Sequence, residues 1–171
     1  MKGMQLFFFS FYLHSMNKEI QSIIKNLEST LTGQPWFGRA VYNLLDETDE
    51  AKVSVKPNDS EHSMIELLWH MNTWASFTLA NLENKSSEEL KAIEENDWRK
   101  IDPVKHSWKN GLKELKSIHK KITDILNTKE DIFLKDMVPN RQYNFRFMLN
   151  GLIQHNIYHA GQVAYLNKLV K

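Results

Sequence analysis

The sequence predicts an all-α protein built as a single four-helix bundle. Apolar residues recur at helical spacing in four long segments of the 171-residue chain, and no run of useful length alternates apolar and polar residues as a half-buried strand would. A chain of this length fits one domain. Helices that each carry one apolar stripe bury it by packing together, so four such helices predict a bundle.

The first half of the chain contains two of the long helices. Residues 17–31 repeat isoleucine and leucine with the helical period, and a Gly-Gln-Pro sequence then interrupts the pattern. A shorter helical stretch follows at residues 40–45. Ser63 and Glu66 have the spacing of a capping box, which predicts the start of the second long helix, over residues 64–82.

The second half contains the other two long helices. The polar residues 83–103 are predicted to form a surface connection with one short helix at residues 88–95. An apolar stripe over residues 104–126 predicts the third long helix, and residues 145–170 form the fourth. Residues 127–144 are predicted to be a loop. These connections are longer than an up-and-down bundle needs, so they leave room for crossovers.

Residues 1–15 do not match the rest of the chain. One lysine precedes a short apolar run, as in a signal peptide, but no small-residue cleavage site follows. The run is too short to span a bilayer. We therefore expect residues 1–15 to be an extension from an upstream start, outside the bundle, and residues 16–171 to be the natural domain, beginning at Met16. Export through a signal peptide is the alternative.

The composition excludes several kinds of function. The chain has no cysteine, which rules out disulfides, thiolate metal ligands and a cysteine nucleophile. This composition is compatible with the cytoplasm, where we expect the protein. Acidic and basic residues are interspersed and the net charge is +1, so no basic stripe supports binding to nucleic acid. We expect neither nucleic acid nor a membrane among its partners.

Two histidines one helical turn apart lie within the apolar pattern of the last helix. Because residues four apart share a face, with Cβ atoms about 5–6 Å apart, His155 and His159 can bring two ring nitrogens to one divalent cation. A lone histidine on an apolar face is more often a core residue with hydrogen-bond partners. Two side by side need two sets of partners, which one metal ion supplies. Asn156 stands where zincin metalloproteases carry their glutamate base, so peptide hydrolysis by that mechanism is not expected.

A third histidine, His70, lies in an apolar part of the second long helix. Glu66, one turn before it, and Trp74, one turn after it, share its face. Glu66 is a candidate to orient His70 or to act as an acid or base, although closing the capping box at Ser63 is the interpretation that we favour. His119 can face inward on the third helix, but we expect it at the edge of the core, partly exposed. The tryptophans are expected mainly in the core, with one or two forming the wall of a pocket.

Three segments carry the motifs of one known family: Trp36-Phe37-Gly38, then Leu67-Leu68-Trp69-His70-Met71 with Trp74, and then Gly151-Leu152-Ile153-Gln154-His155-Asn156-Ile157-Tyr158-His159-Ala160-Gly161-Gln162. In these segments the chain resembles the DinB-like superfamily, a group of metalloenzymes built as four-helix bundles. The resemblance spans residues 17–169, and His-x-x-Tyr-His-x-Gly-Gln is its most specific part. It implies that one histidine of the second helix and two of the last hold the metal. These are His70, His155 and His159, the same three that spacing and apolar context select.

The resemblance also implies chemistry and partners. Relatives include bacillithiol S-transferases and a mycothiol-dependent maleylpyruvate isomerase, in which the metal activates a low-molecular-weight thiol, and members often form homodimers. Candidate substrate contacts here are Trp36, Trp74, Tyr158 and Gln162. Close relatives often have Trp-His-Gly where this chain has Trp36-Phe37-Gly38. Phenylalanine neither ligates a metal nor transfers a proton, which puts a fourth ligand or a catalytic role at that position in doubt.

Two functions from different classes follow. The first is a metal-dependent enzyme, in which one divalent ion activates a thiol cosubstrate or a water for transfer to, or hydrolysis of, a small-molecule substrate. Zinc or nickel is expected before iron or copper. The second is a non-catalytic, stress-induced, dimeric bundle whose histidines hold a structural ion or none. The family resemblance favours the enzyme.

Overall fold

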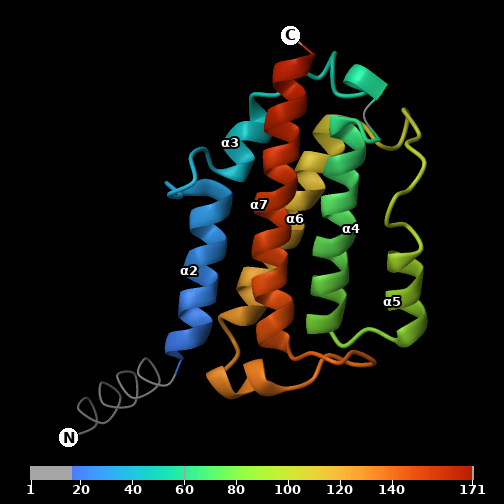
Figure 1. The fold of residues 1–171 in the computed structure, drawn as a ribbon. Coiled ribbons are helices and arrows are strands. Elements are labelled where there is room, and N and C mark those ends of the chain that lie inside the picture. Colours follow the sequence, from blue (N-terminus) through green and yellow to red (C-terminus); the bar gives the residue numbers. More distant parts are fainter. Residues whose placement is uncertain (1–16, 60, 171) are drawn as a thin grey trace, which may run out of the picture.

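The fold is a bundle of four long helices, described for residues 17–59 and 61–170 in a computed structural model. The long helices are α2 (Lys18–Thr32), α4 (Met64–Leu82), α6 (Trp108–Leu126) and α7 (Phe145–Leu169) (Figure 1). Shorter elements are α3 (Val41–Asp46), α5 (Ser87–Glu94) and two 3-10 turns, η1 (Pro57–Asp59) and η2 (Asp131–Lys135). Within these ranges there is no strand, which confirms the predicted all-α bundle. The extension predicted at residues 1–15 lies outside the described residues.

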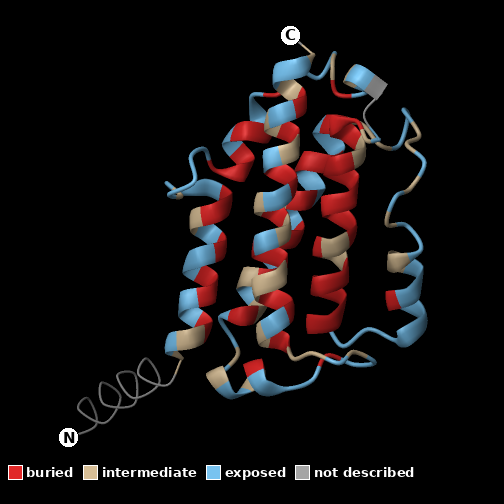
Figure 2. Cartoon of the chain, viewed as in Figure 1, coloured by how far each residue is buried: buried red, intermediate tan, exposed pale blue. Residues whose placement is uncertain are grey.

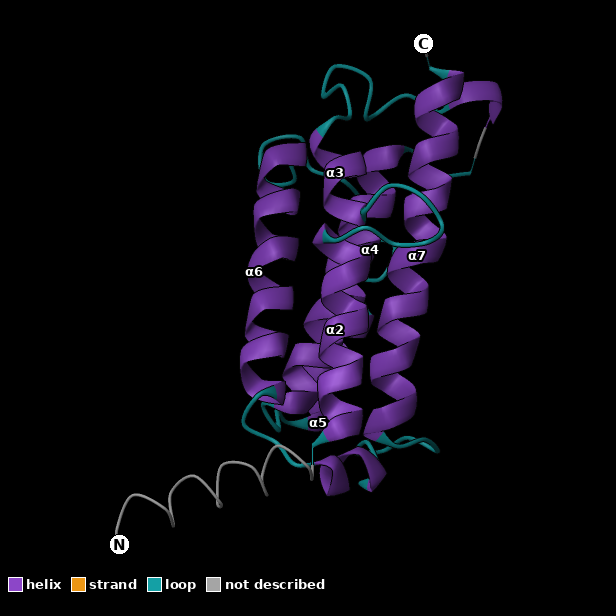
Figure 3. Ribbon diagram, turned by 90° about the vertical axis from the view of Figure 1, so that its left-hand side faces the viewer, coloured by secondary structure: helices purple, strands orange, loops and turns teal. Residues whose placement is uncertain are grey.

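The long helices form a closed ring. α4 packs against α6 and α7, and α2 packs against the same two helices from the other side. Figure 3 shows α2 between α6 and α7, on the side of the bundle that faces away from α5. Of the described helices, none combines the length and apolar character needed to cross a bilayer.

One connection runs the length of the bundle. α2 and α7 point in one direction and α4 and α6 in the other, so the consecutive helices α4 and α6 are parallel (Figure 1). The chain must therefore return along the bundle between them, and residues 83–107 do so, with α5 packed against α4. This return segment, residues 83–107, is the crossover for which the sequence left room.

The return segment leaves α4 more enclosed than α7. Sixteen of the 19 residues of α4 are buried, whereas ten of the 25 residues of α7 are (Figure 2). α4 has the bundle on one side and the return segment on the other, so side chains on more than one of its faces leave water. α7 keeps an ordinary amphipathic surface with one face in solvent.

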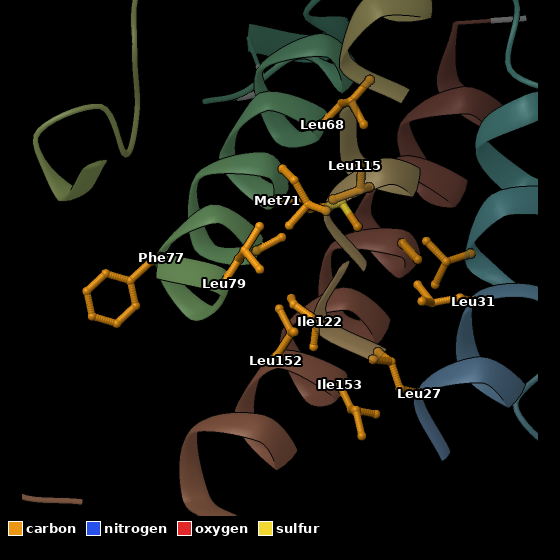
Figure 4. Packing of buried hydrophobic residues seen from close by; sticks show 14 of the residues in the cluster. Leu27, Leu31, Leu68, Met71, Phe77, Leu79, Leu115, Ile122, Leu152 and Ile153 are labelled. Carbon is orange, nitrogen blue, oxygen red and sulfur yellow. The ribbon is translucent and has the colours of Figure 1, made fainter. Parts of the chain in front are cut away.

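The core contains leucine, isoleucine and methionine from all four long helices. Figure 4 labels Leu27 and Leu31 of α2, Leu68 and Met71 of α4, Leu115 and Ile122 of α6, and Leu152 and Ile153 of α7, all of them buried. Burying one such side chain fully contributes about 1.5–3 kcal/mol. Phe77 is also buried but points away from this group (Figure 4), and it packs against Trp74 and under the guanidinium group of Arg141.

The helix starts follow their capping residues. The Glu66 carboxylate accepts hydrogen bonds from the backbone N–H of Ser63 (2.7 Å) and from its hydroxyl (2.8 Å), so the predicted capping box opens α4. The start predicted for the third long helix was wrong, because α6 begins at Trp108 and not at Val104. Asp102 forms a turn there, in which its Oδ1 accepts a hydrogen bond from the N–H of Val104. The helix begins only after Ser107, whose hydroxyl caps it by accepting from the N–H of Asn110.

Candidate metal centre

Three histidines converge between α4 and α7. His70 comes from α4 and His155 and His159 from α7, and one ring nitrogen of each lies within 4.8 Å of the other two. The Nε2 atoms of His70 and His155 lie 2.9 Å apart. Throughout residues 17–59 and 61–170, no other group of three histidine or carboxylate side chains converges in this way. The structure thus brings together the three histidines that the sequence selected.

The spacing of the cluster suits one small cation. Two nitrogens bound to one tetrahedral zinc ion at about 2.0–2.1 Å lie about 3.3–3.4 Å from each other. The nitrogens of the cluster bracket that value, from 2.9 Å between His70 and His155 to at most 4.8 Å. Two lone pairs 2.9 Å apart repel unless a proton or a cation lies between them. The three-histidine cluster therefore fits a metal-binding site.

The outer ring nitrogens of two of the histidines have polar neighbours. Oδ1 of Asp97 lies 2.7 Å from Nδ1 of His70. This contact is close, but its angle does not meet that of a hydrogen bond. The same oxygen accepts a hydrogen bond of 2.7 Å from the indole N–H of Trp74. The side-chain oxygen of Gln162 lies 2.5 Å from Nδ1 of His159. These neighbours favour a proton on each Nδ1 and leave the Nε2 lone pairs for a metal.

Nδ1 of His155 is buried and, like Nδ1 of His70, has no hydrogen-bond partner among the described residues. A buried polar atom without a partner costs free energy, and such atoms are uncommon in folded proteins. The unpartnered atom belongs to a histidine whose other ring nitrogen, Nε2, faces Nε2 of His70. This orphaned nitrogen is a second indication that the cluster is not simply hydrogen-bonded core.

Burial keeps the three imidazoles neutral. Together with a smaller effect of the neighbouring histidines, it lowers the pKa of His155 to about 3 and that of His159 to about 4. Burial also lowers the pKa of His70, although the Asp97 carboxylate acts in the opposite direction. Neutral imidazole is the form that binds a metal, so the cluster holds its ligands ready near pH 7.

The return segment supplies two side chains to the centre. Besides Asp97, it carries Trp98, whose ring stacks on that of His70 with the centroids 3.9 Å apart and on that of His62 with the centroids 3.7 Å apart. Sequence reasoning missed Asp97, because it treated residues 83–103 as surface connection. It expected Trp98, with the other tryptophans, mainly in the core or in the wall of a pocket, whereas Trp98 is 44% exposed. The available signal was the tryptophan itself, which is an unusual residue in a charged stretch.

The other predicted site residues divide into two groups. Gln162 contacts His159, and Tyr158 lies beside it, with its ring centroid 4.9 Å from that of His159. Trp74 reaches the centre through its hydrogen bond to Asp97.

Two predicted site residues lie away from the centre. Trp36 is fully exposed in the loop after α2, where it lines a separate hollow between α2 and α7. Glu66 is held by Ser63 and by an ion pair of 3.0 Å with Lys56, so its contacts are those of the capping box.

The prediction for His119 was wrong, because this residue is buried and not at the edge of the core. Its Nδ1 lies 2.8 Å from the hydroxyl of Tyr42, on α3, and its Nε2 lies 3.1 Å from the side-chain amide nitrogen of Asn156, on α7. Burial lowers its pKa to about 3. Its two ring nitrogens are covered by side chains of α3 and α7, which are far away in the sequence. The apolar stripe of α6 gives no sign of these contacts.

Comparison with known proteins agrees with this architecture. The family model of the DinB superfamily matches residues 37–163, a span that contains His70, His155 and His159. No curated protein matches the chain. The matched span covers most of the sequence and extends from the loop before α3 into α7. On this match, together with the all-α bundle, the chain belongs to the DinB superfamily.

Proposed function

We propose that the protein is a metal-dependent enzyme in which His70, His155 and His159 hold one divalent ion. The observation that carries this proposal is the convergence of three neutral imidazoles from two packed helices, with no thiolate or carboxylate among them. An ion held by three protein ligands keeps a position for a further ligand, and it lowers the pKa of a water or thiol bound there. The reaction class is transfer of a thiol to, or hydrolysis of, a small molecule.

The surrounding residues position the ligands. Asp97 places a negative charge beside Nδ1 of His70, and Gln162 contacts Nδ1 of His159 through its neutral side-chain oxygen. Trp98 covers one face of His70. Because α4 is enclosed on nearly all sides, His70 is held by a rigid element, as a site that must keep its geometry requires.

The finer parts of the proposal concern the ion and the partners. A donor set of imidazoles alone favours zinc or nickel, with iron and copper as alternatives. A low-molecular-weight thiol is the proposed cosubstrate, and Trp74, Tyr158 and Gln162 are the proposed substrate contacts, since each lies beside a histidine or its acidic neighbour. We also propose that the enzyme is cytoplasmic and that it forms a homodimer. Analytical ultracentrifugation tests the homodimer.

Metal titration and a chelator-controlled assay test the proposal. Metal-free protein titrated with zinc or nickel in a calorimeter is expected to bind one ion per chain. Turnover is then screened with several thiols and 1-chloro-2,4-dinitrobenzene, from which an attacking thiolate displaces chloride, before and after chelation. Absence of stoichiometric metal binding refutes the site. Metal binding without any chelator-sensitive turnover favours the non-catalytic bundle with a structural ion.

A further inference from the structure

An apolar pocket lies next to the histidine cluster, between α4 and α7. Its volume is about 180 Å³. Its main walls are Trp74 and Phe77 of α4, Phe147, Met148 and Leu152 of α7, and one polar ring, that of His155. The pocket is open to solvent on one side, where Phe147 is 64% exposed. A small molecule can therefore enter it without unfolding the bundle.

The pocket and the metal centre share a wall. His155 is a candidate metal ligand and also lines the pocket. Trp74 lines the pocket with its ring centroid 6.4 Å from that of His155, and its indole N–H donates to Asp97, the carboxylate beside His70. A molecule in this pocket therefore lies against His155, a member of the cluster.

The polar groups of the pocket leave little for a charged or sugar-like ligand. The hydroxyl of Thr78 donates to the backbone oxygen of Trp74 (3.0 Å), and the indole N–H of Trp74 is used by Asp97. The hydroxyl of Tyr143 is neutral at physiological pH, as tyrosine ordinarily is, and burial raises its pKa further. Moving a charged group into such surroundings without a partner is unfavourable.

We propose that this pocket receives an apolar group of the substrate, a single aromatic ring or a branched alkyl group of similar size, while the reacting end of the same molecule lies at the histidine cluster. The inference rests on the proposed function and names the substrate class for it. The size argument is direct: an engineered cavity of about 150 Å³ lined by leucine, isoleucine and phenylalanine binds benzene. A pocket of about 180 Å³ with aromatic walls holds one such ring and not two.

Gly151 of α7 provides a way to fill the pocket. It lines the pocket, and a Cβ atom added to it meets no other atom within 4 Å. A leucine at this position therefore occupies the pocket without pushing on the backbone. Gly161 is the matched control, because it lies on the same helix, is exposed, does not line the pocket, and has equally open space at its Cβ.

The first experiment measures toluene binding to the zinc-loaded protein by NMR titration. The wild type and Gly161→Leu are expected to bind toluene with the same affinity, Gly151→Ala more weakly, and Gly151→Leu at least about tenfold more weakly, a change of about 1.4 kcal/mol or more. Circular dichroism checks that each variant is folded. No binding to the wild type, or equal binding to Gly151→Leu, overturns the inference.

The second experiment links the pocket to the centre. Benzyl mercaptan and ethanethiol are titrated into the zinc-loaded wild type, Gly151→Leu and Gly161→Leu. The preference for benzyl mercaptan is expected to fall at least about tenfold in Gly151→Leu and to stay unchanged in Gly161→Leu. An unchanged preference in Gly151→Leu overturns the inference. Failure of zinc to bind defeats the proposed function instead, and toluene titration of the metal-free protein then shows separately whether the pocket holds a ring.

Discussion

The bundle buries imidazole rings in two different surroundings. His119 uses both ring nitrogens, one with the Tyr42 hydroxyl at 2.8 Å and one with the Asn156 amide at 3.1 Å. In the cluster, the Nε2 atoms of His70 and His155 face each other at 2.9 Å, and Nδ1 of His155 has no hydrogen-bond partner within the described part of the chain. Burial lowers the pKa of His119 and of His155 alike, to about 3.

The partners of a buried histidine, more than its depth, therefore distinguish a core residue from a ligand. At His119 neutral side chains satisfy both nitrogens, so nothing is gained by adding an ion. In the cluster the polar atoms are incompletely satisfied, at a cost of about 1–3 kcal/mol for each buried group left without a partner. A bound cation takes up the facing Nε2 lone pairs of His70 and His155, which repel each other unless a proton or a cation lies between them.

Removing a ligand gives the largest expected effect. His155→Ala should weaken zinc binding by more than about a hundredfold, since loss of an outer hydrogen-bond partner alone costs about 10–100-fold. His119→Gln, measured in the same calorimetric titration, should keep both the stoichiometry and the affinity. If both variants lose zinc equally, the distinction between the two surroundings is wrong.

The second largest effect is expected from changing Asp97, the carboxylate beside His70. Asp97→Asn should lower zinc affinity by about 10–100-fold, because it removes the negative charge that lies beside Nδ1 of His70 and raises the basicity of the ring. Glu66→Gln, at the carboxylate that the sequence singled out instead, should leave zinc affinity unchanged and weaken only the cap of α4. The two zinc titrations run side by side decide which carboxylate serves the centre.

Tyr42→Phe should act on stability and not on metal binding. It leaves a buried nitrogen of His119 without a partner, so the free energy of unfolding is expected to fall by about 1–3 kcal/mol in urea titrations. Zinc affinity is expected to stay the same. A loss of zinc affinity as large as that of Asp97→Asn would mean that Asn156 couples the two surroundings.

Acid should destabilise the metal-free protein partly through His119. In the unfolded chain a histidine titrates near pH 6.5, whereas in the folded protein burial lowers the pKa of His119 to about 3. Below about pH 6.5 the unfolded state therefore binds a proton that the folded state does not. Stability is lost at about 1.4 kcal/mol per pH unit as the pH falls towards about 3.

The control for this pH effect is His119→Gln, which cannot titrate. Urea unfolding of the metal-free wild type and variant at about pH 7 and about pH 5.5 should show a smaller pH dependence in the variant. Equal dependence in the two proteins would contradict the assignment of that proton to His119.

The features that the sequence predicted are those encoded locally. The start of α4 follows from Ser63 and Glu66, which lie within one turn of each other, and the facing of His155 and His159 follows from helical periodicity alone. The early start predicted for the third long helix failed because apolar periodicity continued through Val104, while the Asp102 turn delayed the helix to Trp108. Turn chemistry overrode the stripe.

The features that it missed depend on contacts between distant segments. Asp97 reaches His70 only because the return segment packs along α4, and no local pattern encodes that docking. His119 is enclosed because α3 brings Tyr42 and α7 brings Asn156 to the same point. A polar residue in a charged stretch and a histidine on an apolar stripe each look ordinary until these neighbours are in place.

The parallel course of α4 and α6 has a consequence for variation among proteins with this architecture. The helices that carry the three histidines are fixed by the core. Asp97 and Trp98 instead belong to the return segment, which only has to span the distance between two helix ends. Such connecting segments tolerate changes of length and composition that a core helix does not. Bundles with identical histidines but different return segments are therefore expected to differ in their affinity for an ion. To change the affinity of the centre, the return segment is the part to exchange, and the histidines can stay.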